Sequence, residues 1–142
     1  MTRGGPTVST TRHAPPTVYI GSFDGNVYAL DAKDGSLRWS RSAGGQVVGS
    51  LSAIGDIVYV AEFTNNTTSG FMMKSGRRVF HYGRGTYSPV ISDGRRLYLT
   101  GYSSLTALQP YKFKRAVAPG IVAPKGKVPR KKRTASNSRP SR

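Results

Sequence analysis

Short apolar runs alternate with polar turn segments from Val18 to Leu108. The first three runs and the two Asp-Gly pairs between them are residues 18–20, 24–25, 27–30, 34–35 and 37–39. An Asp-Gly pair between β-forming runs is a strong hairpin signal, because glycine accepts a positive φ at little cost. Residues 18–39 therefore predict a meander of three antiparallel strands.

The same order of runs and turns occurs twice more along the chain. The later apolar runs are residues 47–50, 57–61, 71–73 and 79–80, and then 88–91, 97–101 and 105–108. Gly35 and Gly76 are 41 residues apart, as are Trp39 and Phe80. A period of about 40 residues with several short strands is typical of propeller blades, whereas helical repeats need a 3.6-residue periodicity. The sequence therefore predicts an all-β fold, a partial β-propeller of two to three four-stranded antiparallel blades.

Segments of different composition flank these repeats. Residues 1–16 are rich in Gly, Thr, Pro and Ser, and Pro15-Pro16 disfavours both a helix and a central strand. We expect a disordered leader over residues 1–16 and a disordered basic tail over residues 111–142. The blades between them are expected at about residues 17–46, 47–85 and 86–110.

The basic charge is concentrated in the predicted tail. Of the 22 Lys and Arg residues, 11 lie in residues 112–142, which hold no acidic residue. The densest basic positions are Lys125, Lys127, Arg130, Lys131, Lys132 and Arg133. Such a block can bind a nucleic acid backbone or an anionic lipid surface, so polyanion binding is one functional hypothesis. A disordered extension without a dedicated partner is the interpretation that we favour.

Composition excludes several classes of site and of segment. The chain has no cysteine, so a disulfide, a thiolate metal site and a cysteine nucleophile are all impossible. No apolar run approaches the ~20 residues of a transmembrane helix. The first 16 residues contain no apolar stretch of the kind found in a signal peptide.

The best-preserved repeat resembles a known family. Ala29-x-Asp31-x-x-Asp34-Gly35-x-x-x-Trp39 is similar to the A-x-D-x-x-T-G-x-x-x-W blade motif of pyrroloquinoline-quinone-type (PQQ-like) propellers, with Asp34 in the place of Thr. That family includes quinoprotein alcohol dehydrogenases and the propeller lipoprotein of outer-membrane assembly. The resemblance covers residues 17–110, about two and a half blades, whereas propellers of the family have seven or eight.

The resemblance implies structural roles for six residues. In the family the motif tryptophan packs between blades, near a glycine of the next repeat. The expected blade-docking residues are therefore Ala29, Asp31, Gly35, Trp39, Gly76 and Phe80. Phe80 stands in the second copy where the first has Trp39, and the third copy has no tryptophan.

Catalysis and metal binding are not expected of this chain. The six acidic residues are spread over three repeats, and turns account for them, whereas calcium needs six to eight converging oxygens. The family's catalytic aspartate, quinone-stacking tryptophan and vicinal disulfide have no counterpart. His13 and His81 have no acidic partner that the repeat pattern would bring close. We therefore predict no catalytic residue, no metal site and no cofactor.

An incomplete propeller points to a role in protein interaction. Two and a half blades cannot close, so the end blades have uncovered faces and need a partner, which includes the missing blades. The leading hypothesis is a non-catalytic scaffold, and the alternative is a terminal fragment of a PQQ-dependent quinoprotein dehydrogenase. The resemblance suggests the bacterial cell envelope or another extracytoplasmic location.

Overall fold

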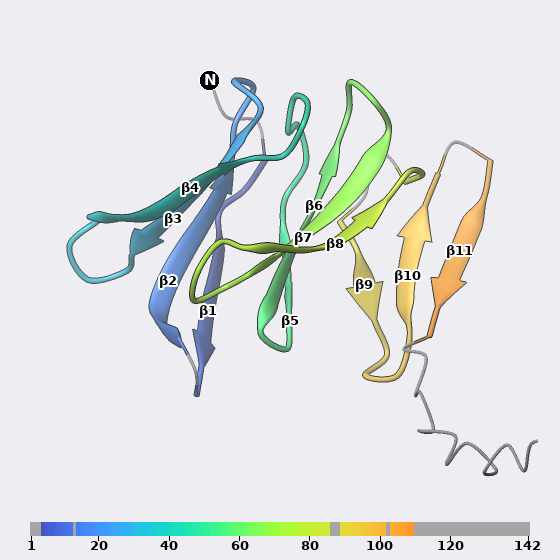
Figure 1. Cartoon of the computed structure of the whole chain (residues 1–142). Helices are drawn as coiled ribbons and strands as arrows, with labels where there is room; N and C mark the ends of the chain where they lie inside the picture. The colour runs from blue at the N-terminus through green and yellow to red at the C-terminus, as the bar shows by residue number, and fades with distance from the viewer. Residues whose placement is uncertain (1–3, 13, 86–88, 102, 110–142) are drawn as a thin grey trace, which may run out of the picture. The chain divides into compact units, whose positions relative to one another are not determined.

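The computed structural model describes residues 4–12, 14–85, 89–101 and 103–109. These residues form eleven β-strands and no helix (Figure 1). All of the strands belong to the first of the two units into which the chain divides, residues 1–111. The all-β prediction is therefore confirmed.

The strands form three antiparallel sheets, each built from strands that follow one another along the chain (Figure 1). The first sheet contains β1 (Thr7–Thr11), β2 (Ala14–Gly21), β3 (Asn26–Asp31) and β4 (Leu37–Ser42). The second contains β5 (Ser52–Ile54), β6 (Ile57–Glu62), β7 (Thr67–Met72) and β8 (Arg78–Tyr82). The third contains β9 (Ile91–Ser92), β10 (Leu97–Thr100) and β11 (Leu105–Leu108). Each sheet has the strand order of a propeller blade.

The prediction of a disordered leader over residues 1–16 is wrong for the residues that the structure describes there. Strand β1 pairs with β2 in the register Val8↔Val18, and β2 includes Pro15 and Pro16. The prolines lie where the register between these strands shifts, so no ladder hydrogen bond needs their missing N–H groups. They also precede Thr17, at which the pairing of β2 with β3 begins. The first sheet therefore begins at β1.

The apolar run at residues 47–50 does not form a strand. This segment connects the first two sheets, and its backbone is held by the bond from Val47 N–H to the Ser22 carbonyl oxygen, at 3.1 Å. The Val47 side chain is fully buried and fills the space beside Gly21, where an added Cβ would stand 2.2 Å from Val47 Cγ1. A short apolar run is compatible with a strand or a buried connection, and packing decides between them.

The hydrophobic core consists of two separate clusters, each formed between neighbouring sheets. The first seam, between the first and second sheets, contains the buried residues Ala14, Tyr19, Val27, Ala29, Trp39, Ala43, Val47, Leu51, Val58, Val60, Phe71 and Met73. The second seam, between the second and third sheets, contains Tyr59, Val90 and Leu99, with Ile54, Ile57, Phe80, Tyr82, Leu97 and Leu108 partly buried around them. Burial between sheets, rather than within one sheet, therefore provides most of the apolar contact.

Candidate functional site

Trp39 on β4 lies at the centre of the first seam. Its side chain is 6% exposed, and its ring centroid lies 5.8 Å from that of Tyr19 and 6.3 Å from that of Phe71. The indole N–H donates to the Met73 carbonyl oxygen at 2.9 Å. The first sheet thus attaches to the second by a large aromatic surface and by one directed hydrogen bond.

Gly76 provides the flat surface on which the indole rests. A Cβ added at Gly76 would stand 2.8 Å from Trp39 Cδ2, closer than real Cβ contacts allow. Gly76 also has φ +67°, in the left-handed region that side chains disfavour. Steric contact and backbone conformation therefore both require glycine at this position.

Met73 joins the two sheets through its backbone and through its side chain. Its carbonyl oxygen accepts a second hydrogen bond from the Tyr19 hydroxyl at 3.4 Å, and its sulfur accepts one from the Ser9 hydroxyl at 3.6 Å. Burial raises the pKa of Tyr19, although a hydrogen bond with Thr17 opposes the shift. Tyr19 therefore keeps its proton and remains a donor at neutral pH.

The turns that precede β4 and β8 have the same hydrogen bonds. Gly35 N–H donates to the Asp31 carbonyl oxygen at 2.9 Å, and Gly76 N–H donates to the Met72 carbonyl oxygen at 2.8 Å. The Asp31 carboxylate accepts from Lys33 N–H at 2.8 Å and forms an ion pair with Arg38. Asp31 therefore orders its own turn and does not enter the seam.

The six residues expected to dock the blades fall into three groups. Ala29 is fully buried in the first seam opposite Trp39 in the strand register, and Gly76 lies against the Trp39 ring. Asp31 and Gly35 lie at the turn between β3 and β4, and Gly35 has nothing within 4 Å of an added Cβ. Phe80 belongs to the second seam.

Phe80 occupies the position in the second sheet that Trp39 occupies in the first. It lies opposite Gly70 in the register, as Trp39 lies opposite Ala29. Its ring meets Tyr59 edge-on at 5.5 Å between centroids, and its side chain is only half-buried. Because phenylalanine has no N–H group on its ring, this contact has no counterpart of the bond from Trp39 to Met73.

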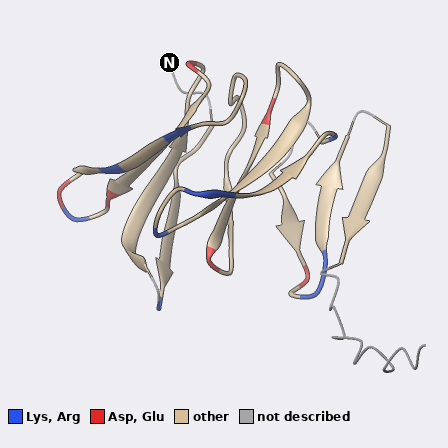
Figure 2. Ribbon diagram, viewed as in Figure 1, with Lys and Arg blue, Asp and Glu red and all other residues tan. Residues whose placement is uncertain are grey.

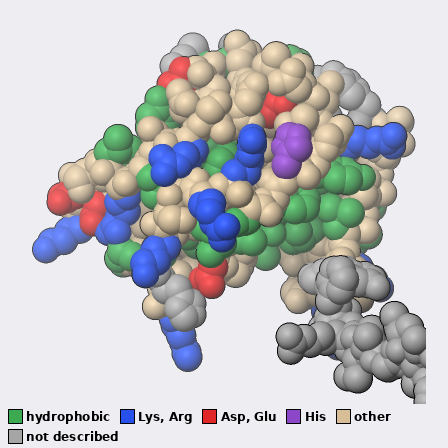
Figure 3. All heavy atoms as spheres, in the orientation of Figure 1, with side chains coloured by type: hydrophobic (Ala, Val, Ile, Leu, Met, Phe, Trp, Pro, Cys, Tyr) green, Lys and Arg blue, Asp and Glu red, His purple; other side chains and the backbone are tan. Residues whose placement is uncertain are grey.

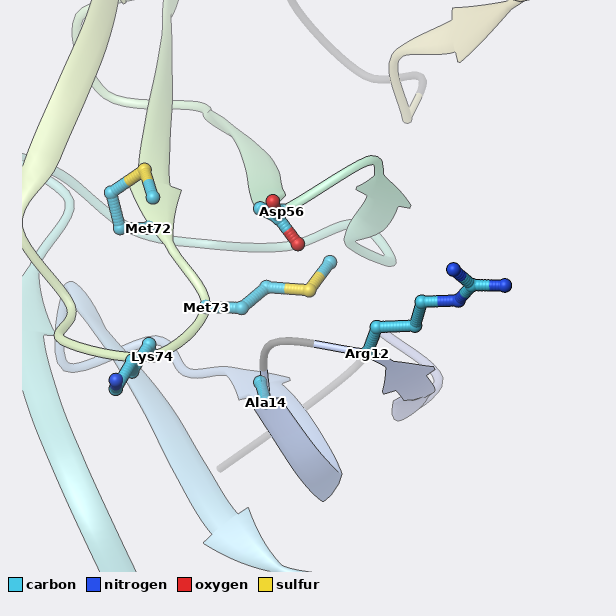
Figure 4. Close-up of a pocket in the computed structure, with 6 residues that line it drawn as sticks. All are labelled: Arg12, Ala14, Asp56, Met72, Met73 and Lys74. Atoms are coloured by element: carbon cyan, nitrogen blue, oxygen red, sulfur yellow. The ribbon is translucent and has the colours of Figure 1, made fainter.

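A cavity of about 490 Å³ opens at one end of the first seam. Its lining residues are Arg12, Ala14, Asp56, Met72, Met73 and Lys74 (Figure 4). The Met73 side chain extends between Asp56 and Ala14, with Arg12 and Lys74 on opposite sides of the view. One carboxylate beside two cations and two thioethers provides no acid–base pair and no nucleophile, so the lining contains no recognisable catalytic arrangement.

Glu62 is the one buried acidic side chain among the described residues, and the sequence analysis did not single it out. Its side chain is 1% exposed and accepts hydrogen bonds from Asn65 N–H at 3.0 Å and from the Thr67 hydroxyl at 2.8 Å. The sequence signal that could have indicated this buried carboxylate is the Glu-x-x-Asn-x-Thr pattern that ends the apolar run at residues 57–61. The β6–β7 turn uses these oxygens, and within the described ranges no three His, Cys, Asp or Glu residues are grouped as a metal site requires.

Three arginines line a groove beside the Trp39–Gly76 contact. The groove has a volume of about 560 Å³ and is lined by Arg41, Ser42, Phe71, Gly76, Arg77 and Arg78. Basic residues on β4 and β8 mark its position in Figure 2, and Lys and Arg side chains gather on the same face in Figure 3. None of these three arginines forms an ion pair with a described residue. The ion pair that the described residues do form joins Arg38 to Asp31. The groove therefore carries uncompensated positive charge.

Some predicted features lie outside the described residues. These are His13 and the six basic tail residues Lys125, Lys127, Arg130, Lys131, Lys132 and Arg133. The other histidine, His81, has its Nδ1 atom 3.3 Å from the Ser69 hydroxyl oxygen. In the part of the chain that the structure describes, no helix has the length and apolar character needed to span a membrane.

Comparison with known proteins gives a family match over most of the chain. The family model described as outer membrane protein assembly factor BamB matches residues 3–116. The crystal structure of BamB from Moraxella catarrhalis is 27% identical, with a TM-score of 0.62 over 75% of this chain and 33% of that chain. None of the curated protein sequences compared with the chain matches it.

Two further solved structures are similar to the fold. The computationally designed Ika8 protein is 12% identical, with a TM-score of 0.59 over 73% of this chain and 33% of that chain. A europium-containing methanol dehydrogenase is 18% identical, with a TM-score of 0.46 over 53% of this chain and 14% of that chain. The chain spans a third or less of the length of these structures and of the Moraxella protein.

Proposed function

The chain belongs to the family described as outer membrane protein assembly factor BamB, and from this premise we propose that it is a non-catalytic scaffold that binds other proteins. The binding surfaces are the outer faces of the first and third sheets. The printed family description, an assembly factor, supports an interaction role over catalysis. The confirmed resemblance to PQQ-like propellers supports the sheet faces as the surfaces where further sheets pack.

Exposed apolar side chains on the two outer faces are the observation that carries this proposal. Val8 and Leu37 on the first sheet are 63% and 59% exposed, and Ile91 and Leu105 on the third sheet are 60% and 67% exposed. Each pair belongs to a face that lies opposite a seam. Large apolar side chains exposed together on one face of a sheet are typical of an interaction site.

The docking residues have a part in this function. Trp39 and Gly76 hold the first two sheets at a fixed spacing, and Phe80 does the same, more weakly, for the second and third. Asp31 and Gly35 shape the turn that borders the outer face of the first sheet. Rigid sheets present a preformed surface, which reduces the ordering cost of binding.

Site-specific photo-crosslinking tests the proposal. A benzophenone side chain at Leu37 or at Leu105 is expected to crosslink to protein partners in cells that express the chain. Val79 is the matched control, because it is also apolar and is 40% exposed but lies on β8 of the middle sheet. Crosslinks from Val79 alone, or from none of the three positions, would contradict binding through the outer faces.

A quinone assay separates the scaffold from the enzymatic alternative. The purified chain, supplied with pyrroloquinoline quinone and calcium, is expected to reduce no redox dye with an alcohol substrate. Dye reduction above the rate of free quinone would instead favour a fragment of a quinoprotein dehydrogenase.

Anion binding is a second candidate function, and the groove formed by Arg41, Arg77 and Arg78 favours it. Guanidinium groups bind carboxylates and phosphates by charge-assisted hydrogen bonds. Titration with heparin at low and high salt tests this function. Binding that vanishes in the triple Arg→Gln variant but survives deletion of residues 116–142 would assign it to the groove; the opposite result would assign it to the predicted basic tail.

A further inference from the structure

The arginine groove lies where β4 of the first sheet meets the second sheet. The first sheet contributes Arg41 to its lining, and the second sheet contributes Arg77 and Arg78. In the order of pairing, β4 and β8 are each the last strand of their sheet (Figure 1). A ligand in this groove would therefore contact both sheets at once.

The strand register explains why arginines from two sheets line one groove. Arg41 lies opposite Val27, and Arg78 lies opposite Phe71. Residues directly opposite each other in an antiparallel pair have their side chains on the same face of the sheet. Val27 and Phe71 are both buried in the first seam. The two arginine side chains therefore leave their sheets toward the same seam, from opposite sides.

Backbone atoms of both sheets hold the Arg41 guanidinium in place. It donates to the Ser40 carbonyl oxygen at 2.7 Å and, across the seam, to the Ser75 carbonyl oxygen at 3.3 Å. A guanidinium group has five N–H donors, so these two bonds leave donors for a ligand. Because the group is already ordered, it loses less conformational freedom on binding than a mobile side chain does.

The chain itself provides no acidic side chain to neutralise the groove. The strands that contribute to it, β4, β7 and β8, contain no Asp or Glu. Residues 112–142 contain 11 Lys and Arg and no acidic residue, so they would add positive charge. The six acidic residues of the chain all lie in or beside turns between neighbouring strands, and they are Asp24, Asp31, Asp34, Asp56, Glu62 and Asp93. The compensating charge therefore has to come from another molecule.

The size of the groove favours an extended ligand over a single small anion. Its volume of about 560 Å³ lies within the ~300–1,000 Å³ that is typical of sites for drug-sized ligands. Phe71 and Gly76 add an apolar part to the lining, on which the aliphatic portion of a ligand can pack. Guanidinium groups pair with carboxylates through two parallel hydrogen bonds. Several residues of a peptide with acidic side chains match this combination.

The lining does not favour single-stranded nucleic acid to the same extent. Proteins that bind such strands stack the bases on aromatic side chains. Phe71 is the aromatic residue of the groove lining, and it is only 1% exposed. The groove therefore offers charge to a phosphate backbone but no surface for the bases.

We propose that the arginine groove binds an extended acidic segment of a partner protein. Carboxylates of that segment pair with Arg41 on the first sheet and with Arg77 and Arg78 on the second. This inference rests on the anion-binding function proposed above and names the ligand of that site. Because the bound segment bridges two sheets in the folded state only, it also stabilises the first seam.

Calorimetric titration of the full chain with two short amidated peptides tests the ligand class. One peptide alternates aspartate and valine, and the other alternates asparagine and valine. The aspartate peptide is expected to bind and to raise the melting temperature, and the asparagine peptide is expected to do neither. Equal binding of the two peptides, or no binding of the aspartate peptide at low salt, would overturn the proposal.

Two arginine pairs give a charge-matched comparison, since each pair directly follows a turn glycine with positive φ. Arg77→Gln with Arg78→Gln removes two charges from the groove, whereas Arg95→Gln with Arg96→Gln removes two exposed charges before β10. The groove pair is expected to weaken binding of the aspartate peptide at least roughly tenfold, as the loss of a charge-assisted hydrogen bond implies. The control pair is expected to have a much smaller effect. Equal weakening would show that the peptide follows overall charge, and the assignment to the groove would be overturned.

Trp39 reports whether the peptide lies in the groove. It is the only tryptophan of the chain, and its ring lies against Gly76, which lines the groove. Its single indole N–H signal in an NMR spectrum is expected to move when the aspartate peptide binds. The same signal in the peptide-free Arg77→Gln, Arg78→Gln variant is expected at its parent position, because the seam remains folded. An indole signal that stays in place while the parent is saturated with peptide would overturn the location.

Two other polyanions separate failure of this inference from failure of the functions on which it rests. Heparin or a single-stranded oligonucleotide could bind through Arg77 and Arg78 while the aspartate peptide does not. That result would overturn the acidic-segment ligand and leave anion binding by the groove in place. Crosslinking from Leu37 and Leu105 tests the scaffold function separately, because neither residue lines the groove.

Discussion

The two seams of the molecule use the same repeat position with different chemistry. In the first seam Trp39 contributes a buried indole and a hydrogen bond to Met73, and these two residues belong to a cluster of twelve buried residues. In the second seam Phe80 is half-buried beside Tyr59, and three fully buried residues form the cluster. A directed bond and a larger buried surface make the first seam the stronger one.

The difference separates two tasks that aromatic residues perform between sheets. An aromatic ring alone fills the space between sheets, and its contribution follows the area that it buries. An indole also fixes the register, because its N–H group reaches one carbonyl oxygen. The first seam therefore sets the relative position of two sheets, while the second relies on packing.

Removal of the two aromatic side chains is expected to give the largest effect. Trp39→Ala leaves a cavity and removes one of the two hydrogen bonds to the Met73 carbonyl, and it costs ~3–5 kcal/mol, as for other buried aromatic residues. This is comparable with the total stability of a small domain, so cooperative unfolding is lost. Phe80→Ala costs less, roughly 1–3 kcal/mol, because its ring is only half-buried. Thermal unfolding followed by circular dichroism measures both, with Leu37→Ala as an exposed control on β4. Equal effects at the two positions would remove the distinction between the seams.

Glycine substitutions separate backbone strain from the contact with Trp39. Gly35→Ala and Gly76→Ala both place a side chain at positive φ, which costs about 1–2 kcal/mol. Gly76→Ala also forces a Cβ against the indole, and overpacking adds about 1–3 kcal/mol. Chemical denaturation of both variants therefore gives a larger loss for Gly76→Ala. A loss of equal size would show that the indole contact is not tight.

Trp39→Phe makes the first seam resemble the second. The substitution keeps an aromatic ring but removes the N–H donor, so one of the two hydrogen bonds to the Met73 carbonyl is lost. The cost of that bond is about 1 kcal/mol, in addition to the smaller ring area. Denaturant unfolding measures the cost, and Tyr59→Phe is the control, since the phenol of Tyr59 makes no hydrogen bond to a described residue. A variant as stable as the parent would show that packing alone holds the seam.

Acid is expected to have the smallest effect, and it acts on the turns of the outer sheets. The Tyr98 hydroxyl donates to Asp93 at 2.7 Å and, with the backbone N–H groups of Arg96 and Arg95, lowers the pKa of Asp93 to about 2. Because the folded pKa lies below the ordinary value of 3.8, this stabilisation is complete above that pH and is lost as the pH falls toward 2. Asp24 has the same contact from Tyr28 at 2.6 Å, which lowers its pKa. Melting temperatures measured between pH 5 and 2 give this loss of stability, and the loss is expected to be smaller in Asp93→Asn. The same dependence of melting temperature on pH in Asp93→Asn and in the parent would contradict the role of Asp93.

Local sequence signals were sufficient for much of the fold. The two Asp-Gly pairs predicted the turns at Gly25 and Gly35, and both glycines have a positive φ in the structure. The spacing of about 40 residues identified repeated sheets, since each copy contains its own strands and turns. The motif at Trp39 identified the family, which the match over residues 3–116 confirms.

Local signals failed where a contact between distant residues decides the outcome. Thr7–Thr11 becomes a strand because β2 offers a partner and places its two prolines at the register shift. Val47 enters the core instead of a strand because Gly21 leaves room for it. In the first case composition alone predicted disorder, and in the second an apolar run did not distinguish a strand from a buried connection.

The sequence by itself determined the repeated strands, the turn glycines and the single tryptophan, because these depend on neighbours within a few residues. Only the tertiary structure decided that Gly76 is covered and Gly35 is open, although the two turns are nearly the same. It also decided that the Met73 carbonyl receives the indole N–H while the Ala32 carbonyl receives no described donor. The reason is physical: the conformation of a turn is local, whereas burial depends on which sheet lies next to it.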